Sequence, residues 1–242
     1  MLQSYNNHIV MKPYPKNLSI VIPVYNEEDR LKKAFKIIEK WHKKQPSWEF
    51  ILVNDGSDDD TEKIIKKFLF VKLVSYSKNQ GKGYALKQGA LKASKPLTLL
   101  CDVDFSTPLT ELPKLAAAIK EADLVIGSRK ALGAKIIKHQ PWWREYLGKQ
   151  FTNLSKLWLG LKVSDVTCGF KLIKTPIAKE LFKQQKIKSW SYDAEILFLA
   201  KRLKYRVVEV PIVWKNDPKT KVSLMKDIFR SIIDLIRIRM FQ

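Results

Sequence analysis

Two aspartates, Asp102 and Asp104, directly follow an apolar run at residues 97–101. Such a run is typical of a strand that is buried on both faces of a parallel sheet. Because side chains alternate along an extended chain, residues two apart point the same way, and both carboxylates are expected to face one point. Proteins usually hold Mg²⁺ or Mn²⁺ with such oxygens and the phosphates of a substrate. The pair therefore predicts a metal site for a nucleoside-diphosphate substrate, with a polar turn closing a strand as the alternative.

Other predicted strands are also followed by polar residues. Apolar runs predict strands at residues 18–24, 50–53, 71–74 and 123–127, and helical spacing predicts helices at 31–41, 64–68, 84–93 and 112–119. This alternation is typical of a Rossmann-like α/β fold, whose mainly parallel sheet has helices on both faces. Ligands of such sheets lie beyond the carboxyl ends of the strands. Tyr25, Glu27, Asp55 and Arg129 fall at those ends.

Glycines flank Lys82 at the predicted start of the helix at 84–93. Gly81 and Gly83 are expected to let backbone amides approach an anion at the N-terminus of this helix. The structural alternative is that Lys82 is simply solvated.

The second half of the chain, after Arg129, has a different pattern. Aromatic and aliphatic residues alternate with Lys and Arg over residues 132–161, which predicts an amphipathic helix. The other predicted segments are a polar loop at 163–171, a helix at 191–203, a strand at 206–213, and a final helix at 224–240 with one apolar and one charged face. A packed helix and a membrane-surface helix remain alternatives for both amphipathic segments.

The formal net charge of +21 among 242 residues requires a polyanionic partner or surface. Nucleic acid, anionic lipid and phosphorylated substrates all attract such a surface. Carboxylates gathered at strand ends serve no purpose in a nucleic-acid-binding protein, so that class is disfavoured.

The two cysteines predict reduced thiols, and the absence of a signal or spanning segment predicts a cytoplasmic protein.

Eight short motifs, in this order, resemble those of the family-2 glycosyltransferases of GT-A fold. Four are general to the family, at residues 21–27 (VIPVYNE), 53–57 (VNDGS), 79–83 (NQGKG) and 102–104 (DVD). Four more are similar to those of dolichyl-phosphate β-glucosyltransferases and related polyprenyl-phosphate sugar synthases, at 127–129 (GSR), 165–171 (DVTCGFK), 190–195 (WSYDAE) and 210–215 (VPIVWK). Mutually confirming motifs in one order are far more specific than any one of them.

The resemblance implies a role for each motif residue. The nucleotide site would be built from Pro23, Tyr25, Glu27, Asp55, Lys82 and Asp102, with Asp55 binding the uracil or ribose. Asp102 and Asp104 would form the metal site for Mg²⁺ or Mn²⁺, with Asp104 the direct ligand. Arg129 and Lys171 would meet phosphates, and Asp193 would lie near the acceptor. Ser106 stands where mannose-type relatives often carry a further metal ligand, Gln, so water is expected to complete the metal shell.

The resemblance therefore implies an inverting transfer of a hexose, most simply glucose from UDP-glucose, to a polyprenyl phosphate. Alternatives are a GDP-mannose donor, a saccharide acceptor, or a nucleotidyltransferase, although the last usually carries a Gly-rich loop after its first strand. The predicted parts are a tail (1–17), a nucleotide-sugar half (18–130), an acceptor half (131–221) and an amphipathic helix (222–242). The expected partners are the nucleotide-sugar, the polyprenyl phosphate and the cytoplasmic face of an anionic membrane, and no nucleic acid.

Overall fold

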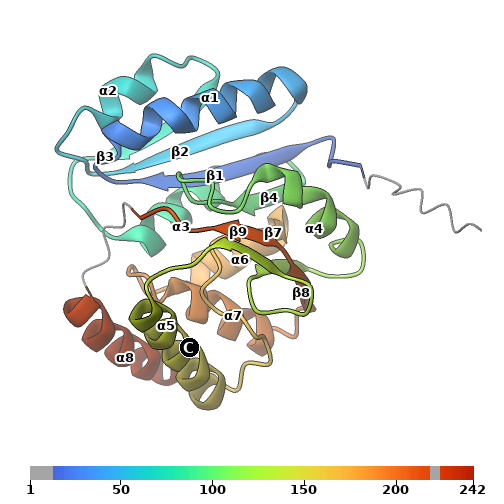
Figure 1. Cartoon of the computed structure of the whole chain (residues 1–242), viewed down its shortest axis with the longest axis vertical. Coiled ribbons are helices and arrows are strands. Elements are labelled where there is room, and N and C mark those ends of the chain that lie inside the picture. Colours follow the sequence, from blue (N-terminus) through green and yellow to red (C-terminus); the bar gives the residue numbers. More distant parts are fainter. Residues whose placement is uncertain (1–12, 219–223) are drawn as a thin grey trace, which may run out of the picture.

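A seven-stranded sheet forms the centre of the protein (Figure 1). The computed structural model describes residues 13–218 and 224–242. The strand order is β3-β2-β1-β4-β7-β5-β8, and all neighbours run parallel except those of β7. The strands are β1 (Leu18–Val24), β2 (Glu49–Asp55), β3 (Val71–Tyr76), β4 (Leu97–Leu100), β5 (Leu124–Ser128), β7 (Lys171–Lys174) and β8 (Val207–Pro211). The predicted Rossmann-like α/β class and its first five strands are confirmed.

Helices cover both faces of this sheet, as predicted (Figure 1). α1 and α2 lie on one side of the first strands, and α3 lies on the other, where α6 and α7 pack beside it. The helices are α1 (Glu28–Lys44), α2 (Thr61–Lys66), α3 (Lys82–Lys92), α4 (Leu112–Ala118) after a short 3₁₀ turn (Leu109–Glu111), α5 (Trp142–Leu159), α6 (Thr175–Gln184), α7 (Tyr192–Arg202) and α8 (Leu224–Phe241). The amphipathic stripe of α1 explains its position, because Leu31, Phe35 and Ile38 are all buried.

The antiparallel strand β7 brings its first residue to the functional edge of the sheet. Lys171 is in register with Leu100 of β4 and with Ile126 of β5. Because β7 runs against its two neighbours, it begins where they end. A residue from the second half of the chain therefore meets the carboxyl ends of strands from the first half.

A second, two-stranded sheet replaces part of what the sequence predicted as helix. Residues 132–161 do not form one helix, because β6 (Lys135–Lys138) pairs with β9 (Val213–Lys215) and α5 begins only after Pro141. Pro141 has extended dihedral angles and ends the first segment. The strand predicted at 206–213 is likewise divided at Ile212 between β8 in the large sheet and β9 in the small one.

The described end of the predicted tail packs against the domain. Tyr14 lies 5.0 Å from the ring of Trp41 and 6.1 Å from that of Trp48, while the carbonyl of Pro15 accepts the Trp48 indole N–H at 2.9 Å. Residues 1–12 of that tail, and the boundary set between 221 and 222, lie outside the described residues.

Helix α3 packs so closely on the sheet that one position admits only glycine. A Cβ at Gly89 would lie 2.2 Å from Cγ1 of Val21 and 2.9 Å from Cγ2 of Val53. Gly148 in α5 is the opposite case, since a Cβ there would meet nothing within 4 Å. The two glycines form a matched pair, one required by packing and one not.

We therefore expect Gly89→Ala to lower the free energy of unfolding by about 1–3 kcal/mol through overpacking. Gly148→Ala should instead raise it by about 0.5–1 kcal/mol, because alanine favours a helix interior. Urea unfolding of both variants measures the difference. A Gly89→Ala protein as stable as the wild type would show that α3 does not press on β1 as described.

Candidate active site

Asp102 and Asp104 lie in a tight turn just after β4. The N–H of Phe105 donates to the carbonyl of Asp102 at 3.1 Å, and Phe105 has a φ of 48°. The N–H of Ser106 donates to Oδ1 of Asp104 at 2.8 Å. The expectation that the two carboxylates share one side of an extended strand is therefore wrong, because the chain turns at Val103. They are nevertheless close enough for the charge of Asp102 to act on Asp104.

Lys82, the first residue of α3, pairs with one of these carboxylates. Its ammonium lies 2.5 Å from Oδ1 of Asp102 and 4.7 Å from the ring centre of Trp190, and its side chain is only 13 % exposed. Burial alone raises the pKa of Asp102, but the charge of Lys82, with smaller contributions from Lys171 and Arg129, brings it below its usual range. The alternative of a solvated Lys82 is thus wrong.

Among the residues that the structure describes, Asp104 forms no ion pair, although the charge of Lys82 also acts on it. Its pKa is raised, first by burial and then by the charge of Asp102, although the Ser106 amide partly offsets both. Two partly exposed carboxylates with one paired ammonium fit a divalent cation, which would balance the remaining charge. Within the described residues no third His, Cys, Asp or Glu joins the pair. The other ligands would be phosphate oxygens and water, as Mg²⁺ prefers.

Asp55, at the end of β2, organises the loop before α3. Its buried carboxylate accepts the Tyr76 hydroxyl at 2.7 Å, the Asn79 amide at 3.1 Å, and the N–H groups of Gln80 and Gly81 at 2.9 Å each. These bonds fix the loop that presents Lys82. Its role in binding the base or ribose stays a prediction.

The backbone amides at the start of α3 are also taken by the protein itself. The N–H groups of Gly83 and Tyr84 donate to the carbonyl of Lys188, at 2.8 Å and 3.2 Å. A Cβ at Gly83 would lie 2.7 Å from the carbonyl oxygen of Ile187. The glycines therefore admit the segment before α7, and the expectation that their amides receive an anion is wrong for Gly81, Gly83 and Tyr84.

Arg129, just after β5, forms an ion pair with Asp165, which was not predicted from the sequence as a site residue. Its Nε and Nη2 atoms donate to the two oxygens of Asp165, both at 2.7 Å, and Nη2 also donates to Thr167 at 2.9 Å. Burial raises the pKa of the Asp165 carboxyl, but Arg129 lowers it to about 2. The N–H of Asp165 donates to Glu209 of β8 at 2.9 Å. Asp165 is the first residue of the motif at 165–171, so the sequence did contain a signal that this residue is important.

Lys171 and Asp193 form a buried ion pair. The Lys171 ammonium contacts Oδ1 of Asp193 and the carbonyl of Cys168, and its side chain is fully buried. Burial raises the pKa of Asp193, although Lys171 and Lys82 lower it in part. The predicted contact of Lys171 with phosphate stays a prediction, because Asp193 already neutralises its charge.

Glycine is required where the loop carrying Cys168 passes the aspartate pair. A Cβ at Gly169 would lie 2.4 Å from Oδ2 of Asp102. Both cysteines of the chain are free and buried, and burial raises the pKa of the Cys168 thiol to about 12. Neither thiol is suited to be a nucleophile at neutral pH.

The residues predicted to form the nucleotide wall lie at the end of β1. The N–H of Glu27 donates to the Thr61 hydroxyl at 2.7 Å, and the Glu27 carboxylate accepts Arg30 at 3.1 Å. Pro23 is in register with Val53 of β2, and Tyr25 is partly buried. These contacts agree with the structural alternative of a strand cap, while the nucleotide role stays a prediction.

Six of the predicted residues form one charged cluster at the edge of the sheet. They are Lys82, Asp102, Asp104, Arg129, Lys171 and Asp193. They come from both halves of the chain, and each charge alters the pKa of at least one other member. Asp55 supports the cluster through the loop that presents Lys82.

This arrangement is the GT-A fold of glycosyltransferases. Glucosyl-3-phosphoglycerate synthase from Mycobacterium tuberculosis, solved with UDP, superposes with a TM-score of 0.66 over 92 % of this chain and 79 % of its own, at 19 % identity. A mannosyltransferase from Pyrobaculum calidifontis, solved with GDP-Man and Mn²⁺, superposes with a TM-score of 0.58 over 91 % of this chain and 64 % of its own, at 16 % identity.

The chain belongs to glycosyl transferase family 2, whose model matches residues 19–182. It is 33 % identical to a dolichyl-phosphate β-glucosyltransferase of Trichomonas vaginalis, over 96 % of this chain and 73 % of that protein. It is 29 % identical to the human dolichyl-phosphate β-glucosyltransferase, over 86 % of this chain and 70 % of that one. The protein is therefore a glycosyltransferase, and the predicted family and fold are confirmed.

We expect Asp165→Asn to lower the free energy of unfolding by about 3 kcal/mol at pH 7, because the buried Arg129 loses its counter-charge. The depressed pKa of Asp165 makes this stabilisation fully present above its unfolded pKa of about 3.9, and it is lost as the pH falls towards about 2. The difference in the free energy of unfolding between wild type and variant, measured with urea, should therefore fall by about half at pH 3.

The control for this variant is Asp58→Asn at an exposed site, which should change the free energy by less than about 0.5 kcal/mol. Equal losses in the two variants at pH 7, or a gap that does not change with pH, would contradict the assignment.

Proposed function

We propose that the protein transfers glucose from UDP-glucose to the phosphate of a polyprenol, with inversion at the anomeric carbon. The observation that carries the proposal is the match to dolichyl-phosphate β-glucosyltransferases over nearly the whole chain. The charged cluster that follows β4 and β5 supports it, since both substrates are phosphates. A GDP-mannose donor, a saccharide acceptor and nucleic-acid binding are not favoured by these relatives.

In this reaction an oxygen of the acceptor phosphate forms a bond to the anomeric carbon while the bond to the diphosphate breaks. The electron pair leaves with UDP. A phosphate monoester has a second pKa near ~6, so it is mostly a dianion at neutral pH and has no proton to lose. The site therefore needs to position charges more than to move a proton.

The chain's own residues would share this task. Asp102 and Asp104 would hold Mg²⁺ or Mn²⁺, which when bound would neutralise charge on the leaving diphosphate. Lys82 orients Asp102 from the first turn of α3. Arg129 and Lys171 supply positive charge whose direction is fixed by Asp165 and Asp193. Asp193 would orient the acceptor or a sugar hydroxyl, and its ion pair with Lys171 makes it a positioning group.

The acceptor lipid lies in a membrane, and we propose that α5 and α8 bind the cytoplasmic face of one. The two helices lie side by side, with the guanidinium of Arg239 donating to the carbonyl of Trp158 at 2.6 Å (Figure 1). Their exposed apolar side chains are Trp142, Trp143, Tyr146, Leu154, Leu157, Trp158, Ile232, Ile233, Ile236, Met240 and Phe241. Trp142 is 80 % exposed and Leu157 is 85 % exposed. Such a surface favours an interfacial site over a packed core.

The same two helices also carry basic residues, and anionic lipid attracts each well-placed one by roughly 1 kcal/mol. They include Lys149, Lys156, Arg230 and Arg237. No helix in the described parts of the chain is long and apolar enough to span a bilayer. The apolar and basic residues together fit a reversible, peripheral contact.

The proposed activity is tested with radiolabelled UDP-glucose or GDP-mannose, together with polyprenyl phosphate in detergent. We expect UDP-glucose to give a labelled product that enters the organic phase, and GDP-mannose to give almost none. Label that reaches only a saccharide, or the opposite donor preference, would contradict the proposal.

Asp104→Asn is expected to reduce transfer by at least about a hundredfold while leaving the thermal unfolding midpoint within a few degrees, because it removes a charge at nearly constant shape. EDTA should have the same effect on the wild type. Asp58→Asn serves as the control and should remain active. An active Asp104→Asn enzyme that needs no divalent ion would rule out the metal assignment.

Replacing Leu157 and Ile236 together by serine should reduce pelleting with anionic vesicles by about tenfold, because the substitutions remove apolar groups from the proposed contact. Leu69→Ser is the control, since Leu69 is 96 % exposed but lies between α2 and β3. High salt should weaken the pelleting of all three proteins. Failure of the wild type to pellet with any vesicle would exclude the contact.

A further inference from the structure

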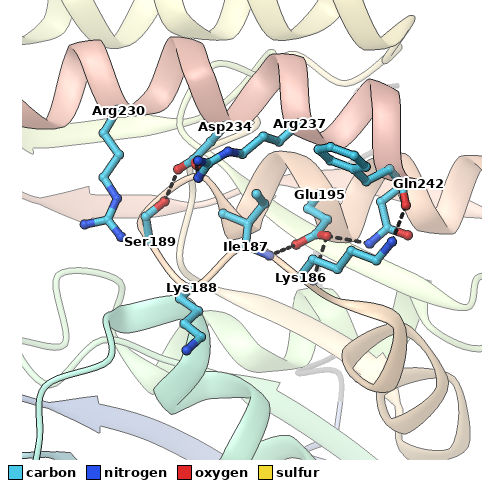
Figure 2. Close-up of a pocket in the computed structure, with 10 residues that line it drawn as sticks. Lys186, Ile187, Lys188, Ser189, Glu195, Arg230, Asp234, Arg237 and Gln242 are labelled. Carbon is cyan, nitrogen blue, oxygen red and sulfur yellow. Dashed lines mark hydrogen bonds and ion pairs between the residues drawn. The ribbon is translucent and has the colours of Figure 1, made fainter.

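A hollow of about 280 Å³ lies between α8 and the segment that leads into α7 (Figure 2). None of the predicted site residues lines it. Its charged lining consists of Lys186, Lys188, Arg230, Arg237, Glu195 and Asp234. The ammonium of Lys188 extends away from the hollow and donates to Gln80, before α3, at 2.9 Å, so Lys186, Arg230 and Arg237 are the basic side chains that remain (Figure 2).

Both carboxylates of the hollow are already engaged in hydrogen bonds. Glu195 is fully buried and accepts the N–H groups of Lys186 and Ile187, each at 2.8 Å, and the side-chain amide of Gln242 at 2.6 Å. Asp234 accepts the Ser189 hydroxyl at 2.5 Å (Figure 2). Arg237 is exposed and its guanidinium lies 3.8 Å from Oδ1 of Asp234, while Arg230 is exposed at the rim (Figure 2).

The position of the hollow on α8 follows from helical geometry. Arg230, Asp234 and Arg237 are spaced i, i+4 and i+7, so they share one face. Ile236 and Met240 belong to a face about 100° further round, and both are exposed. A helix that placed this apolar face in the acyl layer would hold the hollow beside it, at the depth of the lipid head groups.

We propose that this hollow binds a phosphate monoester, as found in the head group of a membrane lipid. The inference rests on the proposed membrane contact of α5 and α8. A phosphate monoester carries about −1.5 to −2 charges at neutral pH, so the net positive charge of the lining attracts it. Arginine binds phosphate through two parallel hydrogen bonds, and Arg230 and Arg237 can each form such a pair, Arg237 while its guanidinium stays near Asp234.

This phosphate site is distinct from the reacting one. The segment with Lys188 and Ser189 separates the hollow from α3, because the Lys188 carbonyl accepts the amides of Gly83 and Tyr84. Trp190, in the same segment, lies over Lys82. A phosphate in the hollow would therefore steady the segment that supports Lys82 without entering the reaction itself.

The test compares vesicles of equal negative surface charge that contain either phosphatidic acid, a monoester, or phosphatidylglycerol, a diester. The variants are Arg230→Gln with Arg237→Gln, and the control Lys32→Gln with Lys33→Gln, which removes two exposed charges from α1. We expect the wild type and the control to bind the monoester vesicles at least about fivefold more tightly than the diester vesicles. The hollow variant should lose this preference, and circular dichroism should show it to be folded.

An equal preference in all three proteins, or none in the wild type, would overturn the proposal. Excess inorganic phosphate, but not chloride at the same ionic strength, should reduce the preference of the wild type. If the variant loses affinity for inorganic phosphate in calorimetry yet keeps its vesicle preference, the hollow takes free phosphate and the lipid assignment is wrong. These readouts need no transfer activity, so they stand even if the proposed reaction fails.

Discussion

Three pairs of opposite charges hold together the loops at the carboxyl ends of the central sheet: Lys82 with Asp102, Arg129 with Asp165, and Lys171 with Asp193. Each pair joins segments that are far apart in the sequence. A buried charge without a partner is strongly destabilising, so these pairs stabilise the arrangement in which the loops meet at this edge. The antiparallel direction of β7 makes this arrangement possible, because it delivers Lys171 to the edge where β4 and β5 end. Asp104 is the member of the cluster that forms no ion pair in the described part of the chain, and it is the proposed ligand of the metal.

The same arrangement links the charged cluster to the C-terminal helix. The segment before α7 contacts the first turn of α3 on one side and Asp234 of α8 on the other. The proposed donor site and the proposed membrane surface therefore share one short stretch of chain. A soluble nucleotide-sugar and a membrane-bound acceptor must meet in this reaction, and the shared stretch places the two binding surfaces next to each other.

Features that depend on a local sequence pattern could be predicted from the sequence. Features that depend on pairing with a distant segment of the chain could not. The alternation of apolar runs with segments of helical spacing was enough to predict β1, β2 and the position of Asp102 at the end of a strand. Residues 135–138 became a strand because β9 pairs with them, and no pattern within 132–161 contains that information. The partner of Arg129 could not be assigned for the same reason, since Asp165 is 36 residues away. The amides after Gly81 looked available for an anion because their acceptor, Lys188, lies more than a hundred residues further along the chain.

The proposed reaction depends most on Asp102 and Asp104 forming a metal-dependent site for a nucleoside diphosphate. Calorimetric titration of UDP-glucose, in Mg²⁺ and then in EDTA, tests this most directly. The account predicts that Mg²⁺ strengthens binding by at least about tenfold in the wild type, corresponding to about 1.4 kcal/mol, and that Asp104→Asn loses this gain. Equal affinity for UDP-glucose with and without the metal, or an undiminished gain in Asp104→Asn, would contradict it.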